Sequence, residues 1–403
     1  MTDDGALRLP EGTRLLHIGP HKTGTTSVQG AFHAARAEVA AQGVHYAGPN
    51  RHPRQAAQAA ARTSLKASGG GARAWSGLLR EVRSAPGRVL ISSEWFADAS
   101  DEAARDIIEA LDRDRTHVVV TLRPLTGILP SQWQQFVQAG MTTPYLEWLR
   151  AIFDEPSSGA GRRFWRRHRH DRLIARWAAI AGTDRVSAVV VDGQDHSVVL
   201  RAFERLLGLR PGTLRLENNH ANRSLALPEA ELVRALNVAF ASVGLAGQAQ
   251  LDLVLFGAAA ALKQREPSSG LPRIETPAWA LARATDVAGE IVEGIRDTGI
   301  RVDGDLARLV ERPLPASTRA AARSAAPMPD AAALWPEIVA TGAIGVLTAA
   351  GLARSGGRAS DVHGFSNQRL RSIFLARLRD AAASRARAAD RMPSIHSAGV
   401  EVE

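Results

Sequence analysis

The feature that most constrains the fold lies near the start of the chain, where an apolar run passes directly into a glycine-rich loop. Residues 15–30 read LLHIGPHKTGTTSVQG, so three glycines, a lysine and several hydroxyl-bearing residues follow the apolar segment. Residues 13–19 predict a buried strand, and residues 25–43 have helical composition and end at Gly43. A strand, a glycine loop and a helix in this order are typical of a phosphate-binding loop.

Three later apolar segments predict further strands of the same sheet. They are GRVLISSE at 87–94, THVVVTLR at 116–123 and DRVSAVVVDG at 184–193. Helical segments alternate with them. One of these helices carries four large apolar side chains on one face: Leu173, Ile174, Trp177 and Ile180. The alternation favours a parallel sheet, so we expect an α/β fold.

The composition changes in the second half of the chain. From Leu227 onward the spacing of apolar residues is mostly helical. We therefore expect an α/β core over about 13–220 and a helical part over about 221–311, both within one domain at 1–311.

The C-terminal region is predicted to be separate from this domain. Residues 312–330 form a linker rich in proline, alanine and serine. The extension at 331–403 includes the most apolar later stretch, IVATGAIGVLTAAGLA at 338–353. This stretch is short for a bilayer span and rich in glycine and alanine, so we predict a buried or interfacial helix.

The glycine loop departs from the loop of nucleoside triphosphatases, G-x-x-x-x-G-K-[ST]. Gly19 and Gly24 have the required spacing, but Thr25 follows the second glycine and the lysine, Lys22, precedes it. A triphosphatase also needs an acidic magnesium ligand at the end of a later strand, whereas the segment at 116–123 ends in arginine. We therefore expect a ligand that carries anionic groups at two separate places.

Two motifs resemble those of sulfotransferases, whose donor is 3′-phosphoadenosine 5′-phosphosulfate (PAPS). HIGPHKTGTTSVQ at 17–29 resembles their 5′-phosphosulfate loop, K-[ST]-G-T-[TS]. VVVTLRPLTGILPSQWQQFV at 118–137 resembles their 3′-phosphate motif, in which a serine follows a strand-end arginine by eight residues, as Ser131 follows Arg123. The resemblance extends, in less specific segments, over roughly the first 240 residues. It implies the three-layer parallel sheet of the P-loop kinase/sulfotransferase type.

The resemblance also implies which residues bind the donor. Those expected at the 5′-phosphosulfate are Lys22, Thr23, Gly24, Thr25, Thr26 and Ser27. Lys22 would in addition stabilise the charge that builds on the bridging oxygen as the S–O bond breaks. Arg123 and Ser131 would hold the 3′-phosphate. Alternatively, Thr25 or Thr26 caps the helix that follows the loop. Ser131 could likewise be a helix cap, and Arg123 could pair with a surface carboxylate.

Glu94 is the expected catalytic base. It ends the segment at 87–94, and ligands of open α/β sheets bind at the carboxyl ends of strands. Cytosolic sulfotransferases use a histidine as base, whereas several polysaccharide sulfotransferases and some bacterial ones resemble each other in using glutamate. The alternatives are that Glu94 is a structural carboxylate and that His21, the neighbour of Lys22, takes the proton.

The same resemblance suggests the other participants in the reaction. The product of the donor would be adenosine 3′,5′-bisphosphate (PAP), and this arrangement requires no metal. By analogy with bacterial relatives we expect the acceptor to be a carbohydrate or glycolipid hydroxyl.

Composition narrows the chemistry further. None of the 403 residues is cysteine, which excludes disulfides, thiolate zinc sites and cysteine nucleophiles. The first residues, MTDDGALRLPEG, are acidic and contain no apolar h-region. We therefore expect no secretory signal, no transmembrane segment and a cytoplasmic location.

The chain is basic, with a net charge of +9 that suits acidic ligands. Its densest basic stretch is GRRFWRRHRHDR at 161–172. This stretch could be a nucleic-acid-binding surface, a solvated helix start, or a rim that attracts an anionic acceptor or the donor. We expect no nucleic-acid partner. The alternatives to a sulfotransferase are an ATP-dependent kinase of P-loop ancestry and a basic nucleic-acid-binding protein.

Overall fold

The computed structural model describes residues 8–63, 69–157, 159–191, 195, 197–216, 223–245, 247–266, 271–310 and 336–350. The chain divides into two compact units. Unit 1 comprises Met1–Trp133, Pro144–Asn219 and Glu275–Ala326, and unit 2 comprises Gln134–Thr143, His220–Ile274 and Pro327–Glu403. The predicted linker at 312–330, and the extension at 331–403 apart from 336–350, lie outside the described residues.

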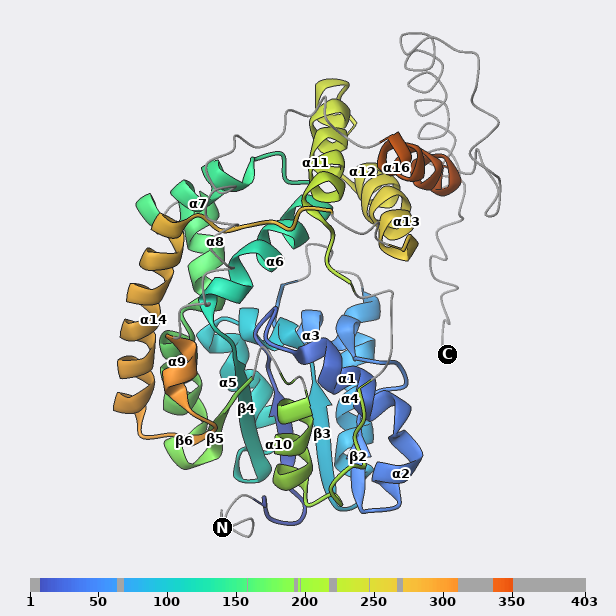
Figure 1. Ribbon diagram of the computed structural model, residues 1–403. Coiled ribbons are helices and arrows are strands. Elements are labelled where there is room, and N and C mark those ends of the chain that lie inside the picture. The colour runs from blue at the N-terminus through green and yellow to red at the C-terminus, as the bar shows by residue number, and fades with distance from the viewer. Residues whose placement is uncertain are drawn as a thin grey trace, which may run out of the picture. The chain divides into compact units, whose positions relative to one another are not determined.

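Unit 1 contains a six-stranded sheet in which all neighbouring strands are parallel (Figure 1). The strands are β1 (Arg14–His17), β2 (Val44–Tyr46), β3 (Arg88–Ser92), β4 (Thr116–Leu122), β5 (Val186–Val190) and β6 (Arg301–Asp303). Their order across the sheet is β2-β3-β1-β4-β5-β6. β1, β3, β4 and β5 confirm the four predicted strands. Each is a short apolar run that is buried almost throughout, as expected for inner strands of a parallel sheet.

The two edge strands were not predicted. β2 and β6 have three residues each, too few to show a periodic pattern, and β6 has the partly charged sequence RVD. β6 pairs in parallel with β5, from Ser187↔Arg301 to Val189↔Asp303. This pairing corrects the expected end of the α/β core near residue 220, because the sheet takes its last strand from much later in the chain.

Helices connect the strands and pack on both faces of the sheet. The helices of unit 1 are α1 (Thr25–Ala34), α2 (Arg36–Ala40), α3 (Arg54–Ala60), α4 (Gly69–Ser84), α5 (Asp101–Ala110), α7 (Tyr145–Asp154), α8 (Gly159–His168), α9 (His170–Ala181), α10 (Ser197–Leu207) and α14 (Ala278–Thr298). Short 3-10 turns occur at η2 (Glu94–Asp98), η3 (Arg113–Arg115), η4 (Thr183–Arg185) and η7 (Leu306–Leu309). α6 (Leu125–Gln138) begins in unit 1 and ends in unit 2. Figure 1 shows α10 in front of the strands and α5 and α9 behind them.

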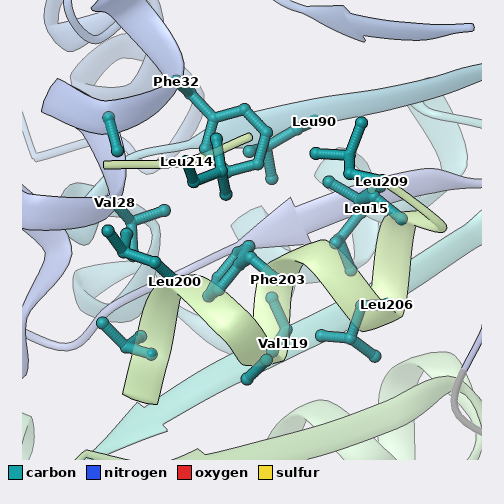
Figure 2. Packing of buried hydrophobic residues seen from close by; sticks show 14 of the residues in the cluster. Leu15, Val28, Phe32, Leu90, Val119, Leu200, Phe203, Leu206, Leu209 and Leu214 are labelled. Atoms are coloured by element: carbon teal, nitrogen blue, oxygen red, sulfur yellow. The ribbon is translucent and has the colours of Figure 1, made fainter. Parts of the chain in front are cut away.

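A hydrophobic core fixes α1 and α10 on the sheet (Figure 2). Leu15, Leu90 and Val119 come from three neighbouring strands and belong to this buried cluster. Phe203 of α10 lies over them, with its ring 6.1 Å from the ring of Phe32 in α1. Burial of a side chain of this size stabilises the fold by about 1.5–3 kcal/mol. The packing therefore holds the loop between β1 and α1 firmly against the strand ends.

The predicted apolar helix face is also confirmed. It lies on α9, where all four of its members are buried: Leu173, Ile174, Trp177 and Ile180. α9 packs against β4, β5, α5 and α14. The segment at 278–298, which the sequence places in the helical part of the domain, forms α14 and belongs to the same unit as the sheet.

Unit 2 is helical in its described part. Its helices are α11 (Leu227–Ser242), α12 (Gln248–Leu253), α13 (Ala259–Gln264) and α16 (Pro336–Ala349), with a π-helical turn, η6 (Val254–Ala258), between α12 and α13. η6 and α16 approach closely, since a Cβ at Gly257 would lie 2.8 Å from the Gly345 carbonyl oxygen. The helix predicted at 338–353 is thus a packed one, with Ile338 and Val346 fully buried. No helix among the described residues is long and apolar enough to cross a membrane.

Candidate functional site

Three strand ends meet at one edge of the sheet. β1 lies between β3 and β4 and runs parallel to both, so the segments that follow these strands emerge side by side. The glycine loop, residues 18–24, follows β1. Glu94 lies two residues after β3, and Arg123 comes directly after β4. A Cβ at Gly19 would lie 3.0 Å from the Glu94 Cα, so the loop backbone lies directly against Glu94.

The glycine loop turns sharply before α1. Gly19, Lys22 and Gly24 have positive φ angles of 82°, 68° and 90°. Glycine adopts this region readily, whereas a lysine there costs of order 1 kcal/mol and must be held by its surroundings. Gly24 is the N-cap residue of α1, and no side chain caps this helix. The alternative that Thr25 or Thr26 is the cap is therefore wrong, and the first turn of α1 keeps the positive end that attracts anions.

A network of uncharged side chains connects the glycine loop to the strands beneath it, β1, β3 and β4. The Thr23 hydroxyl donates to the Pro20 carbonyl oxygen at 2.6 Å and lies 2.7 Å from the hydroxyl of Thr121 in β4. His17, the last residue of β1, contacts the Ser92 hydroxyl through Nδ1 at 2.8 Å and the Thr121 hydroxyl through Nε2 at 3.3 Å. Burial lowers the pKa of His17 to about 3, so its imidazole is neutral at physiological pH. We call His17, Thr23, Ser92 and Thr121 the hydroxyl brace.

The remaining loop residues differ in their exposure. Thr25 is buried, and its hydroxyl lies 3.5 Å from the Pro20 carbonyl oxygen. Thr26 is exposed and Ser27 is half-buried. Of the hydroxyls expected at the donor, that of Thr23 is already hydrogen-bonded within the loop and to Thr121. Thr26 and Ser27, in the first turn of α1, are less buried.

Arg123 lies against the glycine loop. Its Nη1 donates to the Lys22 carbonyl oxygen at 3.3 Å. Burial lowers the pKa of the Arg123 guanidinium, which nevertheless stays cationic at neutral pH. In the part of the chain that the structure describes, Arg123 forms no ion pair with a carboxylate, so the alternative of a surface salt bridge is wrong. A half-buried cation without a counter-ion is a natural place for an anionic ligand.

Ser131 lies close to Arg123 through Gly127. A Cβ at Gly127 would lie 3.2 Å from Nε and Nη2 of Arg123, so the guanidinium packs directly over this glycine. The Ser131 hydroxyl, one helical turn later, donates to the Gly127 carbonyl oxygen at 3.3 Å. α6 continues through Pro130, and Ser131 is an interior residue of this helix. The alternative that Ser131 is an N-cap is therefore wrong.

Glu94 begins the η2 turn and is half-buried. Gln29 of α1 donates its amide to the Glu94 Oε2 at 3.2 Å and to the Ser92 carbonyl oxygen at 3.3 Å. Burial by itself raises the pKa of Glu94, but the charge of His21, a backbone N–H and the Gln29 amide outweigh it and hold the pKa below its ordinary value. Glu94 is therefore an ionised carboxylate at neutral pH. Gln29, which orients this carboxylate, belongs to the helix that begins at the glycine loop.

His21 is buried inside the glycine loop and does not face solvent. Its Nε2 lies 3.4 Å from Oδ2 of Asp98, which ends the η2 turn, and its ring meets the Trp95 ring edge-on with centroids 5.3 Å apart. Arg167 of α8 donates Nε and Nη2 to the two Asp98 carboxylate oxygens at 2.9 and 2.8 Å. We call His21, Glu94, Asp98 and Arg167 the charged cluster.

The basic stretch at 161–172 is largely used inside unit 1. It spans the end of α8 and the start of α9, and three of its rings are buried: Phe164, His168 and His170. Arg169 pairs with Asp171 and with Glu290 of α14. Arg166 donates to the Asp98 carbonyl oxygen at 2.7 Å. Arg166, Arg167 and Arg169, three of the six arginines in this stretch, therefore bind carboxylate or carbonyl oxygens within unit 1.

Some residues at this edge were not predicted from the sequence. Gln29 and Thr121 lie within the quoted motifs, and the four-residue spacing of Gln29 from Thr25 could have placed it on the same helix face. No sequence pattern pointed to Asp98, because its partner Arg167 is distant in the sequence. His52, between β2 and α3, has its pKa lowered by burial, while the charge of Glu94 acts in the opposite direction.

Two further arginines approach this edge. Arg51 donates Nη2 to the Thr26 carbonyl oxygen at 3.3 Å. The Arg54 guanidinium lies over the Trp95 ring at 5.6 Å from its centroid. Arg51, before α3, therefore adds positive charge beside the glycine loop, and Arg54, the first residue of α3, adds it beside the η2 turn.

Comparison of the chain with protein-family models, with curated proteins and with solved structures found no match. Among the described residues, no group of three or more histidine, aspartate and glutamate side chains could hold a metal ion.

Proposed function

We propose that this chain is a sulfotransferase of the P-loop kinase/sulfotransferase type, which moves a sulfuryl group from PAPS to an acceptor hydroxyl. The observation that carries the proposal is Arg123. It is a half-buried cation with no carboxylate partner among the described residues, and it donates directly to the backbone of the glycine loop. A nucleotide bound at the loop would therefore meet a second positive group, and PAPS has a 3′-phosphate to offer where ATP has none.

The residues of the site suit the two ends of this donor. The 5′-phosphosulfate lies at the first turn of α1, with Lys22, Gly24, Thr25, Thr26 and Ser27 around it and Thr23 bracing the loop. Its 3′-phosphate lies between Arg123 and Ser131, and the packing of both side chains against Gly127 supports this assignment.

The reaction is an in-line displacement at sulfur. The acceptor oxygen forms a bond to sulfur while the bond between sulfur and the bridging phosphate oxygen breaks, and PAP leaves. Lys22 stabilises the charge that develops on the bridging oxygen. The acceptor proton goes to Glu94, whose carboxylate is ionised at neutral pH and oriented by Gln29. We propose a carbohydrate or glycolipid hydroxyl as the acceptor.

Calorimetry with PAP and ATP tests the donor assignment. We expect PAP to bind without magnesium and ATP to bind more weakly. Magnesium-dependent ATP binding without any affinity for PAP would refute the proposal in favour of a kinase. Steeply salt-dependent binding of DNA or RNA that survives Lys22→Ala, with no PAP binding, would favour a nucleic-acid-binding protein.

Arg123→Gln sharpens this test. Loss of the 3′-phosphate contact should weaken PAP binding by about 10- to 100-fold, because a charge-assisted contact contributes about 1.5–3 kcal/mol. Affinity for adenosine 5′-phosphate, which has no 3′-phosphate, should stay unchanged. Arg105→Gln, an exposed arginine of α5, is the matched control. An equal loss for both nucleotides would show that Arg123 supports the loop and not the 3′-phosphate.

The acceptor can be sought directly. Transfer of labelled sulfate from PAPS into lysate fractions of the source organism tests donor and acceptor together. We expect label in a saccharide or glycolipid fraction. Label in small phenols alone would contradict the proposed acceptor class while supporting the donor.

A further inference from the structure

The η2 turn carries a charged side chain at each end. Glu94 begins this turn and Asp98 ends it. α8 clamps the Asp98 end, since Arg167 binds both carboxylate oxygens and Arg166 binds the Asp98 carbonyl oxygen. Arg176 of α9 adds a hydrogen bond to the Ala97 carbonyl oxygen at 3.0 Å. The basic stretch thus fixes the segment that carries the proposed base.

Asp98 connects this clamp to the glycine loop. Its side chain is 9% exposed and lies 3.4 Å from Nε2 of His21, which is 3% exposed. His21 is also close enough to Glu94 for its charge to lower the pKa of that carboxyl. Burial by itself raises the pKa of Asp98, but His21 and Arg167 lower it well below its ordinary range, so Asp98 is ionised. His21 therefore lies beside the carboxylate at one end of η2 and acts electrostatically on the carboxylate at the other end.

We propose that Asp98, clamped by Arg167, is a positioning residue that holds the His21 imidazole of the glycine loop beside the η2 turn, which begins at Glu94. Its importance for catalysis rests on the proposed function, in which Glu94 is the base. Asp98 lies beside the His21 imidazole in a buried place, and the interaction of His21 with Glu94 favours the ionised form of that carboxyl until the acceptor hydroxyl arrives. Arg167 restricts Asp98 to one orientation through its two hydrogen bonds.

Other titratable groups face the same two residues and must be considered with them. His17 of β1, Tyr46 of β2 and His52 all interact electrostatically with Glu94. His168 of α8 interacts with His21. None of these groups is changed in the variants below, so their contributions cancel when the variants are compared with the wild-type protein.

The sign of one pKa change tests the proposal. We would label glutamate with ¹³C in the side-chain carboxyl, titrate the wild-type protein and Asp98→Asn by NMR, and assign Glu94 from the signal that Glu94→Gln lacks. Removal of a neighbouring negative charge would by itself lower the pKa of Glu94. If Asp98 acts through His21, the pKa of Glu94 should instead rise, by about one pH unit, because the positive charge is no longer held beside it.

Further variants separate positioning from a general loss of structure. His21→Gln should raise the pKa of Glu94 at least as much as Asp98→Asn, and the double variant should add nothing further. Asp98→Glu, which keeps the carboxylate, should restore most of the wild-type value. Arg163→Gln, at an exposed position of the same helix as Arg167, should have no effect.

The outcomes that overturn the inference are distinct from those that overturn the proposed function. An unchanged or lowered pKa of Glu94 in Asp98→Asn, with native circular dichroism, would refute the positioning role. If this variant does not fold, Arg167→Gln decides the question, because a smaller rise in the same direction is expected. Failure of the wild-type protein to bind PAP in calorimetry would refute the donor assignment but would leave the Glu94 titration to decide the role of Asp98.

Discussion

Two polar networks hold the glycine loop, and they differ in charge. The hydroxyl brace is uncharged and fully buried, since burial keeps His17 neutral and its three hydroxyl partners are shielded from solvent. The charged cluster contains the carboxylates of Glu94 and Asp98, the guanidinium of Arg167 and the His21 imidazole, and it reaches the surface at Arg167, whose side chain is 20% exposed. Neutral hydrogen bonds fix a backbone at a low cost of desolvation, whereas buried charges cost more and can change the protonation of a neighbour. We infer from this difference that the hydroxyl brace maintains the conformation of the glycine loop, whereas the charged cluster takes part in the proposed reaction.

The largest effect is expected in the charged cluster. Glu94→Gln keeps the size of the side chain and one acceptor for Gln29, but removes the base. We expect sulfuryl transfer to fall by about 10²–10⁴-fold, because a positioned base contributes about this much. PAP affinity and the free energy of unfolding should stay near the wild-type values. The measurement is PAP release from PAPS, with the acceptor fraction found by sulfate labelling.

The control for Glu94→Gln is a carboxylate outside the cluster. Glu109→Gln removes an exposed carboxylate that pairs with Arg113 on the surface, and it should leave the rate unchanged. A nearly normal rate in Glu94→Gln would move the base to His21 or to His52, and the charged cluster would then support structure alone.

The second effect is expected in the hydroxyl brace. Thr23→Val keeps the shape of the side chain but removes the hydroxyl that contacts the Pro20 carbonyl oxygen and Thr121. Buried groups left without their partner cost about 1–3 kcal/mol, so the free energy of unfolding in urea should fall by this amount. Thr23→Ser, which keeps the hydroxyl, should lose less. A loss of PAP affinity without a loss of stability would show instead that Thr23 contacts the donor, as the motif predicts.

The sequence predicted some residues of the candidate site and missed others. Lys22, Glu94 and Arg123 were found because each lies in a motif or at the end of an apolar strand, and the parallel sheet then brings those ends together. The partners of Asp98 could not be found in this way, since Arg167 comes from a helix far along the chain and hydrogen bonds between distant segments leave no local pattern. His17 was interpreted as part of a strand, and only burial shows that it is neutral.

The sequence missed two strands for a related reason. β2 and β6 are too short for a periodic pattern, so their place in the sheet depends on tertiary contacts. β6 in particular follows α14, whose packing against α9 carries the chain back to the edge of the sheet. A strand of three residues forms there because a parallel neighbour is already in position.

The smallest effect is expected in the pH dependence of the free energy of unfolding, in which the two networks differ. The pKa of His17 is about 3 in the folded protein and about 6.5 in an unfolded chain. Between these values the unfolded state binds a proton that the folded state does not, so acid lowers the free energy of unfolding by up to about 1.4 kcal/mol per pH unit. His17→Asn should therefore show a shallower fall between pH 6.5 and 5 in urea denaturation, while the other buried histidines act equally in both proteins.

The charged cluster acts in a different pH window, which makes this measurement selective. Asp98 and Glu94 have lowered pKa values in the folded state, so their contribution is present above the ordinary values of 3.8 and 4.5 and is lost only as the pH falls below them. Above pH 5 the slope thus reports on the hydroxyl brace and the other buried histidines, not on the carboxylates. If His17→Asn and the wild-type protein have the same slope, His17 is not held neutral, and the two networks would no longer differ in charge.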